Sequence, residues 1–74
     1  MFLAQKIDET LLLSFGQLIE EGTIIIHIDK KLIMEYHFSN SDFEKIYLSE
    51  KMRSAKLEIK LIHNNQIDIR AIHT

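Results

Sequence analysis

The sequence lacks cysteine altogether, which excludes disulfide bonds and metal sites built from thiolates. It has only two glycines, Gly16 and Gly22, so it contains no glycine-rich loop of the kind that cradles phosphate. No apolar run approaches the roughly 18 to 20 residues that a membrane-spanning helix needs, and the first residues do not form a secretory signal. Together these absences predict a cytoplasmic protein without membrane contact, resident in the host cytoplasm if a phage encodes it.

The charge balance argues against one class of function. The 9 lysines and arginines are outnumbered by 11 acidic residues, which gives a formal net charge of -2 at pH 7. Proteins whose main task is to grip phosphate backbones usually carry a clear basic excess, so direct nucleic-acid binding is not expected. Acids prevail over residues 35–50 and bases over residues 51–60, although the ordinary interpretation of each single charge is solvated surface.

The length of 74 residues predicts a single domain over residues 1–74. A chain of this size buries a small fraction of its surface, so its stability as a monomer is marginal. Association into a homodimer is therefore expected.

Two helices are predicted from spacing and capping. Residues 3–20 carry apolar side chains at the spacing of an amphipathic helix, and Gly22 suits the C-terminal end of that helix. Ser41 and Glu44 have the spacing of a capping box, which predicts a second helix over residues 42–50.

Four strands are predicted from β-branched content and alternation. Residues 23–28 and 32–38 form one expected hairpin around a three-residue turn at 29–31, with Ile26 opposite Met34 and Ile24 opposite Tyr36. Residues 57–61 and 67–72 form a second hairpin around a three-residue turn at 63–65, which would turn Ile67 and Ile69 toward the core. The predicted class is α+β, in the order α-β-β-α-β-β, with a four-stranded antiparallel sheet and two helices on one face.

Little in the chain supports catalysis or a bound cofactor. The four histidines do not form a close pair with a nearby carboxylate, so neither a metal nor another cofactor is predicted. The serines fall mainly at expected caps and loops, where backbone hydrogen bonding explains them, and no nucleophilic triad can be assembled. We therefore expect a binding protein rather than an enzyme, and no small-molecule substrate.

The most informative motif joins the end of a predicted strand to the second predicted helix. In this helix Phe43 and Tyr47 are four residues apart and share one face beside Glu44. Two rings in this position are either ordinary core or the centre of a binding surface. The residues proposed for partner binding are Glu35, Tyr36, His37, Asp42, Phe43, Glu44 and Tyr47.

Residues 23–63 resemble the small uracil-DNA glycosylase inhibitors of short-tailed Bacillus phages. The resemblance depends on the joint occurrence of Glu35-Tyr36-His37 and, after a short polar loop, Ser41-Asp42-Phe43-Glu44 with Tyr47 on the next turn. It implies a DNA mimic that occupies the enzyme's DNA-binding groove as a compact dimer. Its acids would stand where phosphates lie, and a hydrophobic box would trap the apolar side chain that the enzyme inserts into the minor groove.

The resemblance also implies a role for each motif residue. Phe43 and Tyr47 would line the hydrophobic box, and Glu35 and Glu44 would present negative charge to the enzyme's phosphate-binding loops. Tyr36 and His37 would support the box or the dimer contact.

A different interpretation of the sequence also stays open. The chain could be a small dimeric phage or bacterial regulatory or anti-defence module. Such a module would bind another protein or nucleic acid through a sheet face that carries Ile25 and Ile33, or through the basic segment 51–60.

Overall fold

The computed structural model describes residues 2–48 and 55–73, and it consists of β-strands and turns in those two ranges. The five strands are β1 (Leu3–Ile7), β2 (Thr10–Ile28), β3 (Lys31–Tyr47), β4 (Lys56–His63) and β5 (Gln66–His73). All pairings are antiparallel: β2 pairs with β3 along one edge, and with β1 and then β4 along the other, while β5 pairs with β4. The predicted α+β class with a four-stranded sheet is therefore wrong, because the described chain is all-β with five strands.

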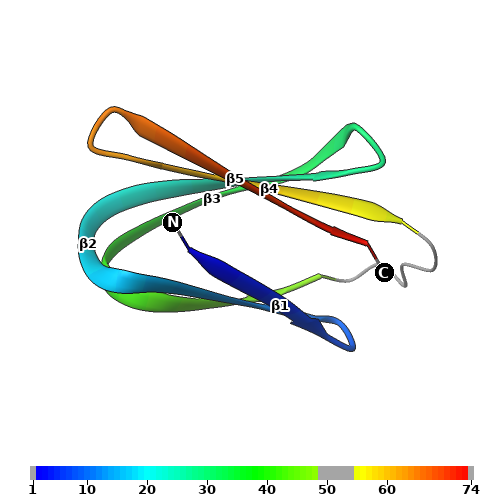
Figure 1. The fold of residues 1–74 in the computed structure, drawn as a ribbon, viewed down its shortest axis with the longest axis horizontal. Coiled ribbons are helices and arrows are strands. Elements are labelled where there is room, and N and C mark those ends of the chain that lie inside the picture. Colours follow the sequence, from blue (N-terminus) through cyan, green and yellow to red (C-terminus); the bar gives the residue numbers. More distant parts are fainter. Residues whose placement is uncertain (1, 49–54, 74) are drawn as a thin grey trace.

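The sheet is strongly bent where β2 and β3 change register. Between the pairs Ser14–Phe43 and Ile19–Ser41, four residues of β2 lie opposite one residue of β3. Gly16 in this bulge has φ +72°, and Asn40 on the neighbouring strand has φ +51°. Bulges of this kind sharpen the bend and twist of a strand. In Figure 1 β2 and β3 turn together at this point, so the sheet curls into an open half-barrel.

The bend divides the sheet into two lobes. The first lobe contains β1, residues 10–14 of β2 and residues 43–47 of β3; the second contains residues 19–28 of β2, residues 31–41 of β3, β4 and β5. The core lies between them and is built from the inward side chains of both. Its buried members are Phe2, Leu11, Leu13, Phe15, Ile19, Ile24, Ile26, Ile28, Ile46, Leu48, Ala55, Leu57, Ile59 and Leu61.

The predicted helix over residues 3–20 is wrong, because this segment forms β1, a turn and the first part of β2. Leu11, Leu13 and Phe15 are all buried, whereas Leu18, at a helical core position, is 66% exposed. Alternate burial of this kind is the pattern of a strand with one face on the core. The apolar residues of this segment fit the period of a helix as well as that of a strand. Its pairing with β3 makes it a strand.

The predicted helix over residues 42–50 is also wrong. Residues 42–47 belong to β3, and residues 49–50 lie outside the described residues. Ser41 and Glu44 are in contact, but not through the backbone hydrogen bonds of a capping box: Ser41 Oγ accepts from the Phe43 amide at 3.2 Å and lies 2.6 Å from a Glu44 carboxylate oxygen. Here they stabilise the bend of a strand and do not start a helix.

Both predicted hairpins exist, but their turns contain two residues instead of three. Asp29 and Lys30 have φ values of +49° and +69°, and Asn64 and Asn65 have +47° and +58°. Positive φ at both central positions is the signature of a type I′ turn, which matches the twist of a hairpin.

The shorter turns have different consequences in the two hairpins. In the first, a bulge near His27 restores the predicted pairs Ile26–Met34 and Ile24–Tyr36, which are confirmed. In the second, no bulge compensates, and Ile62 rather than Leu61 pairs with Ile67. The prediction that Ile67 and Ile69 face the core is wrong, since their side chains are 61% and 55% exposed.

Candidate functional site

The outer face of the first lobe carries a cluster of apolar side chains from three strands. The register places Leu3, Ser14 and Phe43 in one row across the sheet. Ile7, Thr10 and Tyr47 form another row, and Leu12 lies between the two. Residues directly opposite each other in antiparallel strands point to the same face. We call this set the aromatic face: Leu3, Ile7, Leu12, Phe43 and Tyr47.

The aromatic face is open to solvent although most of it is apolar. The exposed fractions are 65% for Leu3, 49% for Ile7, 48% for Phe43 and 63% for Tyr47. A shallow hollow beside Phe43 is lined by Leu3, Ala4, Gln5, Leu12, Ser14 and Phe43. Gln5 and Lys45 flank Leu12 in the row between the two others, so polar side chains separate the apolar ones on this face. Single exposed apolar residues are ordinary, but several on one face of a small protein favour an interaction surface.

Tyr47 is fixed at the rim of this face by a hydrogen bond. Its hydroxyl donates to the Glu9 carboxylate at 2.5 Å, and Glu9 lies in the turn between β1 and β2. This hydrogen bond and the charge of Glu9 raise the pKa of Tyr47 above its ordinary value of 10.0. The ring is therefore held in place while its surface stays accessible.

Tyr36 and Glu44, two of the predicted partner-binding residues, face the inside of the bend instead. The Tyr36 hydroxyl donates to Glu44 at 2.6 Å, and Ser41 lies 2.6 Å from the other carboxylate oxygen. The hydrogen bond to Glu44, together with burial, raises the pKa of Tyr36 above 10.0. Glu44 thus connects the two halves of β3 across the bend, and its carboxylate is occupied within the chain.

Glu35 and His37 lie on the outer face of the second lobe. His37 Nδ1 is 3.0 Å from the Thr23 hydroxyl, and His37 Nε2 is 3.3 Å from Glu35. Both side chains of the Glu35–His37 pair are largely exposed, so their interaction contributes little to stability. Asp42, the remaining predicted residue, is exposed at the bend next to Phe43.

The structure therefore separates the seven predicted residues into groups, and Phe43 and Tyr47 remain together on an exposed face. The sequence prediction missed the partners of these rings on β1 and β2: Leu3, Ile7 and Leu12. The available signal was the polar pair Asp8-Glu9 between two apolar segments, which is typical of a turn.

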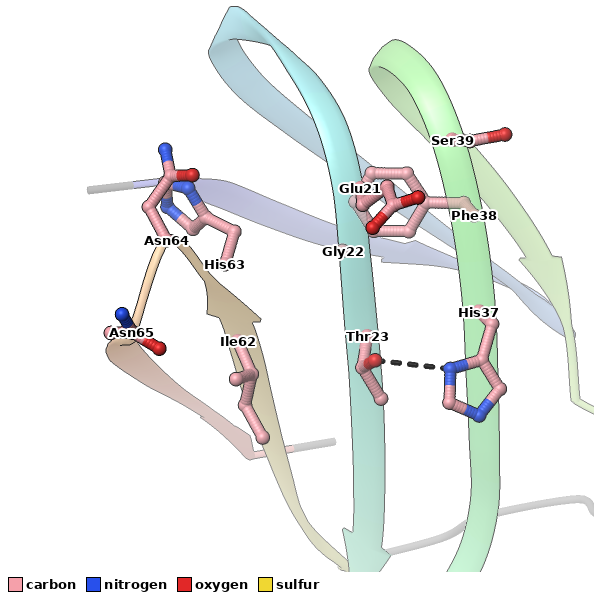
Figure 2. A pocket seen from close by; sticks show the side chains of 10 residues that line it. All are labelled: Glu21, Gly22, Thr23, His37, Phe38, Ser39, Ile62, His63, Asn64 and Asn65. Atoms are coloured by element: carbon pink, nitrogen blue, oxygen red, sulfur yellow. Dashed lines mark hydrogen bonds between the residues drawn. The ribbon is translucent and has the colours of Figure 1, made fainter.

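A second hollow lies at the end of the second lobe, where the turn between β4 and β5 approaches β2 and β3 (Figure 2). Figure 2 shows His37 and His63 on opposite sides of it, with the Thr23–His37 hydrogen bond on the β2–β3 side. His63 is 7% exposed, and its Nδ1 has no hydrogen-bond partner among the described residues. The Thr23 hydroxyl and the His37 imidazole are within hydrogen-bond distance at this hollow, and the Glu35 carboxylate lies beside the other ring nitrogen.

Neither a metal centre nor a spanning helix is found in the described ranges. Residues 2–48 and 55–73 contain no group of three histidines or acids that could hold a metal ion. The same ranges contain no helix with the length and apolar character needed to cross a membrane.

We expect both tyrosines to titrate above their ordinary pKa of 10.0, which the absorbance of the phenolate measures. Glu44→Gln should lower the pKa of Tyr36, and Glu9→Gln that of Tyr47, because each change removes the anion beside the hydroxyl. Folding stabilises the neutral phenols, so their contribution to stability is complete below pH 10 and is lost as pH rises through the raised values. A titration left unchanged by both substitutions would contradict the two hydrogen bonds.

No family model matches the chain, and neither a curated protein nor a solved structure matches it.

Proposed function

We propose that this chain is a protein-binding module that acts through the aromatic face. The observation that supports the proposal is that Phe43 and Tyr47 are both exposed on one face, where Phe43 lines a hollow together with Leu3 and Leu12. Burying exposed apolar area against a partner is the main favourable term in association. Aromatic side chains dominate interfaces because they bring a large apolar surface and lose few rotamers.

The rigidity of this face favours binding as well. Phe43 and Tyr47 project from β3, which is paired with β2 behind them, and Glu9 restrains the Tyr47 hydroxyl. A surface that is ordered before binding loses less conformational entropy when it binds. The aromatic face therefore has the features of a preformed docking surface for an apolar projection on another protein.

The partner class that we propose to test first is a uracil-DNA glycosylase, met in the host cytoplasm. An enzyme that flips bases inserts an apolar side chain into the duplex, and an apolar hollow with an aromatic wall suits such a side chain. Asp42 is exposed at the bend but does not line this hollow. In this proposal Glu44 does not contact the glycosylase, because its carboxylate is already hydrogen-bonded to Tyr36 and Ser41.

Substitution of the rings is the first test. Phe43→Ala and Tyr47→Ala should each weaken binding to the partner at least about tenfold, because each removes a large exposed ring from the proposed interface. Leu18→Ala is the matched control, since Leu18 is 66% exposed on the neighbouring strand and does not line the hollow beside either ring. Calorimetric titration against a glycosylase, and against proteins captured from a cell lysate, measures the effect.

An assay of uracil excision distinguishes the proposal of a glycosylase partner from the general proposal of a protein-binding module. Uracil excision that continues at full rate in the presence of stoichiometric protein would exclude the glycosylase as the partner. A captured protein whose affinity is reduced by Phe43→Ala and unaffected by Leu18→Ala would still support the general proposal. Equal effects of the ring substitutions and the control would contradict both.

A further inference from the structure

Strand β5 ends the strand order of the sheet, so one of its edges has no paired strand. Among the described strands it pairs with β4 alone, and it lies close to β1 without pairing with it. Its outward side chains include Ile67 and Ile69, both more than half exposed. An exposed edge with apolar side chains and unpaired backbone groups is a template for strand addition.

The hairpin geometry shows which backbone groups point to this edge. In a hairpin with a two-residue turn, the pair that flanks the turn is hydrogen-bonded, and here that pair is His63–Gln66. Hydrogen-bonded and non-hydrogen-bonded pairs then alternate along the ladder. The residues of β5 in non-hydrogen-bonded pairs turn their N–H and C=O groups outward: Ile67, Ile69 and Ala71.

We propose that two copies of this chain pair their β5 strands antiparallel, about a two-fold axis at Ile69. Ile69 of one copy then lies opposite Ile69 of the other, and Ile67 lies opposite Ala71. All of these residues have their backbone groups on the free edge, so each of these opposed pairs exchanges two hydrogen bonds. The same surface on both copies forms the contact, as two-fold symmetry requires.

Charge complementarity selects this register. With the axis at Ile69, Asp68 of each copy lies opposite Arg70 of the other. Moving the axis by one residue in either direction keeps the backbone hydrogen bonds in phase, but it places Asp68 opposite Asp68 or Arg70 opposite Arg70. Opposite charges directly across a strand pair stabilise it, and like charges destabilise it.

Arg70 and Asp68 can each take part in an ion pair with the other copy. Arg70 Nε donates to the backbone oxygen of Phe2 at 2.8 Å, and the other guanidinium N–H groups remain to meet a carboxylate. Asp68 already makes an interaction within its own chain, and a carboxylate accepts several hydrogen bonds at once. The dimer uses the edge of the second lobe, so it leaves the aromatic face of each copy on the first lobe free to bind.

Sedimentation equilibrium of the whole chain tests the proposal. The wild-type protein is expected to dimerise with rising concentration, and Ile69→Lys should weaken dimerisation at least about tenfold by placing two lysines opposite each other. Ile67→Lys is the matched control, because in this register it faces Ala71 and should weaken dimerisation less. A wild-type chain that remains monomeric at submillimolar concentration, or equal effects of the two lysines, would overturn the proposal.

A charge reversal tests the register by a second route. Asp68→Arg should weaken dimerisation by placing arginines opposite each other, and the double variant Asp68→Arg/Arg70→Asp should restore it. Circular dichroism identifies variants that fold like the wild-type chain. Loss of dimerisation in a folded double variant would exclude this register. These results are independent of the ring substitutions, which act on the other lobe.

Discussion

Replacing Leu13 by alanine is expected to lower the free energy of unfolding by about 3 to 4 kcal/mol. Leu13 is fully buried, and it projects from β2 into the core between the two lobes. Alanine removes apolar contacts and leaves a cavity that surrounding β-strands fill only in part, because their positions are fixed by the ladder. A domain of this size has a total stability of roughly 4 to 11 kcal/mol, so the loss would be a large part of it.

Urea denaturation followed by circular dichroism measures this loss, with Leu18→Ala as the matched control. Leu18 lies on the same strand and is 66% exposed, so its truncation should change the free energy of unfolding by less than about 0.5 kcal/mol. If Leu13→Ala does not fold, Ile26→Val gives a milder version of the same test at another fully buried site of β2, with an expected loss of about 1 kcal/mol. Similar losses for Leu13→Ala and Leu18→Ala would contradict the strand periodicity that distinguishes this fold from a helix.

The hairpins were predictable because local sequence determines them. The segments 23–28, 32–38, 57–61 and 67–72 all lie within observed strands, and their β-branched content and alternation are local properties. Turn length was less predictable, since a two-residue and a three-residue turn use the same residue types and differ in the φ values that only the structure reveals.

The long strands were not predictable in the same way. The pairing of residues 10–14 of β2 with residues 43–47 of β3 joins segments about 30 residues apart, and no short window contains both. Without that partner, residues 3–20 satisfy a helical period as well as an alternating one. The capping-box residues Ser41 and Glu44 add a local signal for a helix, and tertiary pairing overrides it.

The candidate site was predicted in part for a geometric reason. Residues four apart share a face on a helix and also on a strand, so Phe43 and Tyr47 share a face whichever element forms, although a strand sets them about 13 Å apart with Lys45 between them. Glu44 differs, because adjacent residues of a strand point to opposite faces, and its side chain therefore turns away from both rings. Leu3 and Leu12 reach the same face only through strand pairing, which the sequence pattern alone does not define.

Replacing Gly22 by valine is expected to lower the free energy of unfolding by about 2 to 3 kcal/mol. Gly22 is opposite Phe38 in the β2–β3 ladder, and the phenyl ring covers the place where a side chain would start. A Cβ atom there would lie 2.7 Å from Phe38 Cε1 and closer still to Cζ. The ring cannot move freely, because it stacks on Phe15 with centroids 5.0 Å apart, so valine forces both rings out of their packing.

A double-mutant cycle identifies this clash as the cause. Phe38→Ala removes the ring that meets the new side chain, so Gly22→Val should cost at least about 1 kcal/mol less in the Phe38→Ala background than in the wild-type chain. Gly16→Val gives the contrast: a Cβ there meets no atom within 4 Å, and the cost arises from the positive φ of the backbone. The cost of Gly16→Val should be the same with or without Phe38. If Gly16→Val and Gly22→Val showed the same coupling to Phe38→Ala, the aromatic ring would not be the reason for glycine at position 22.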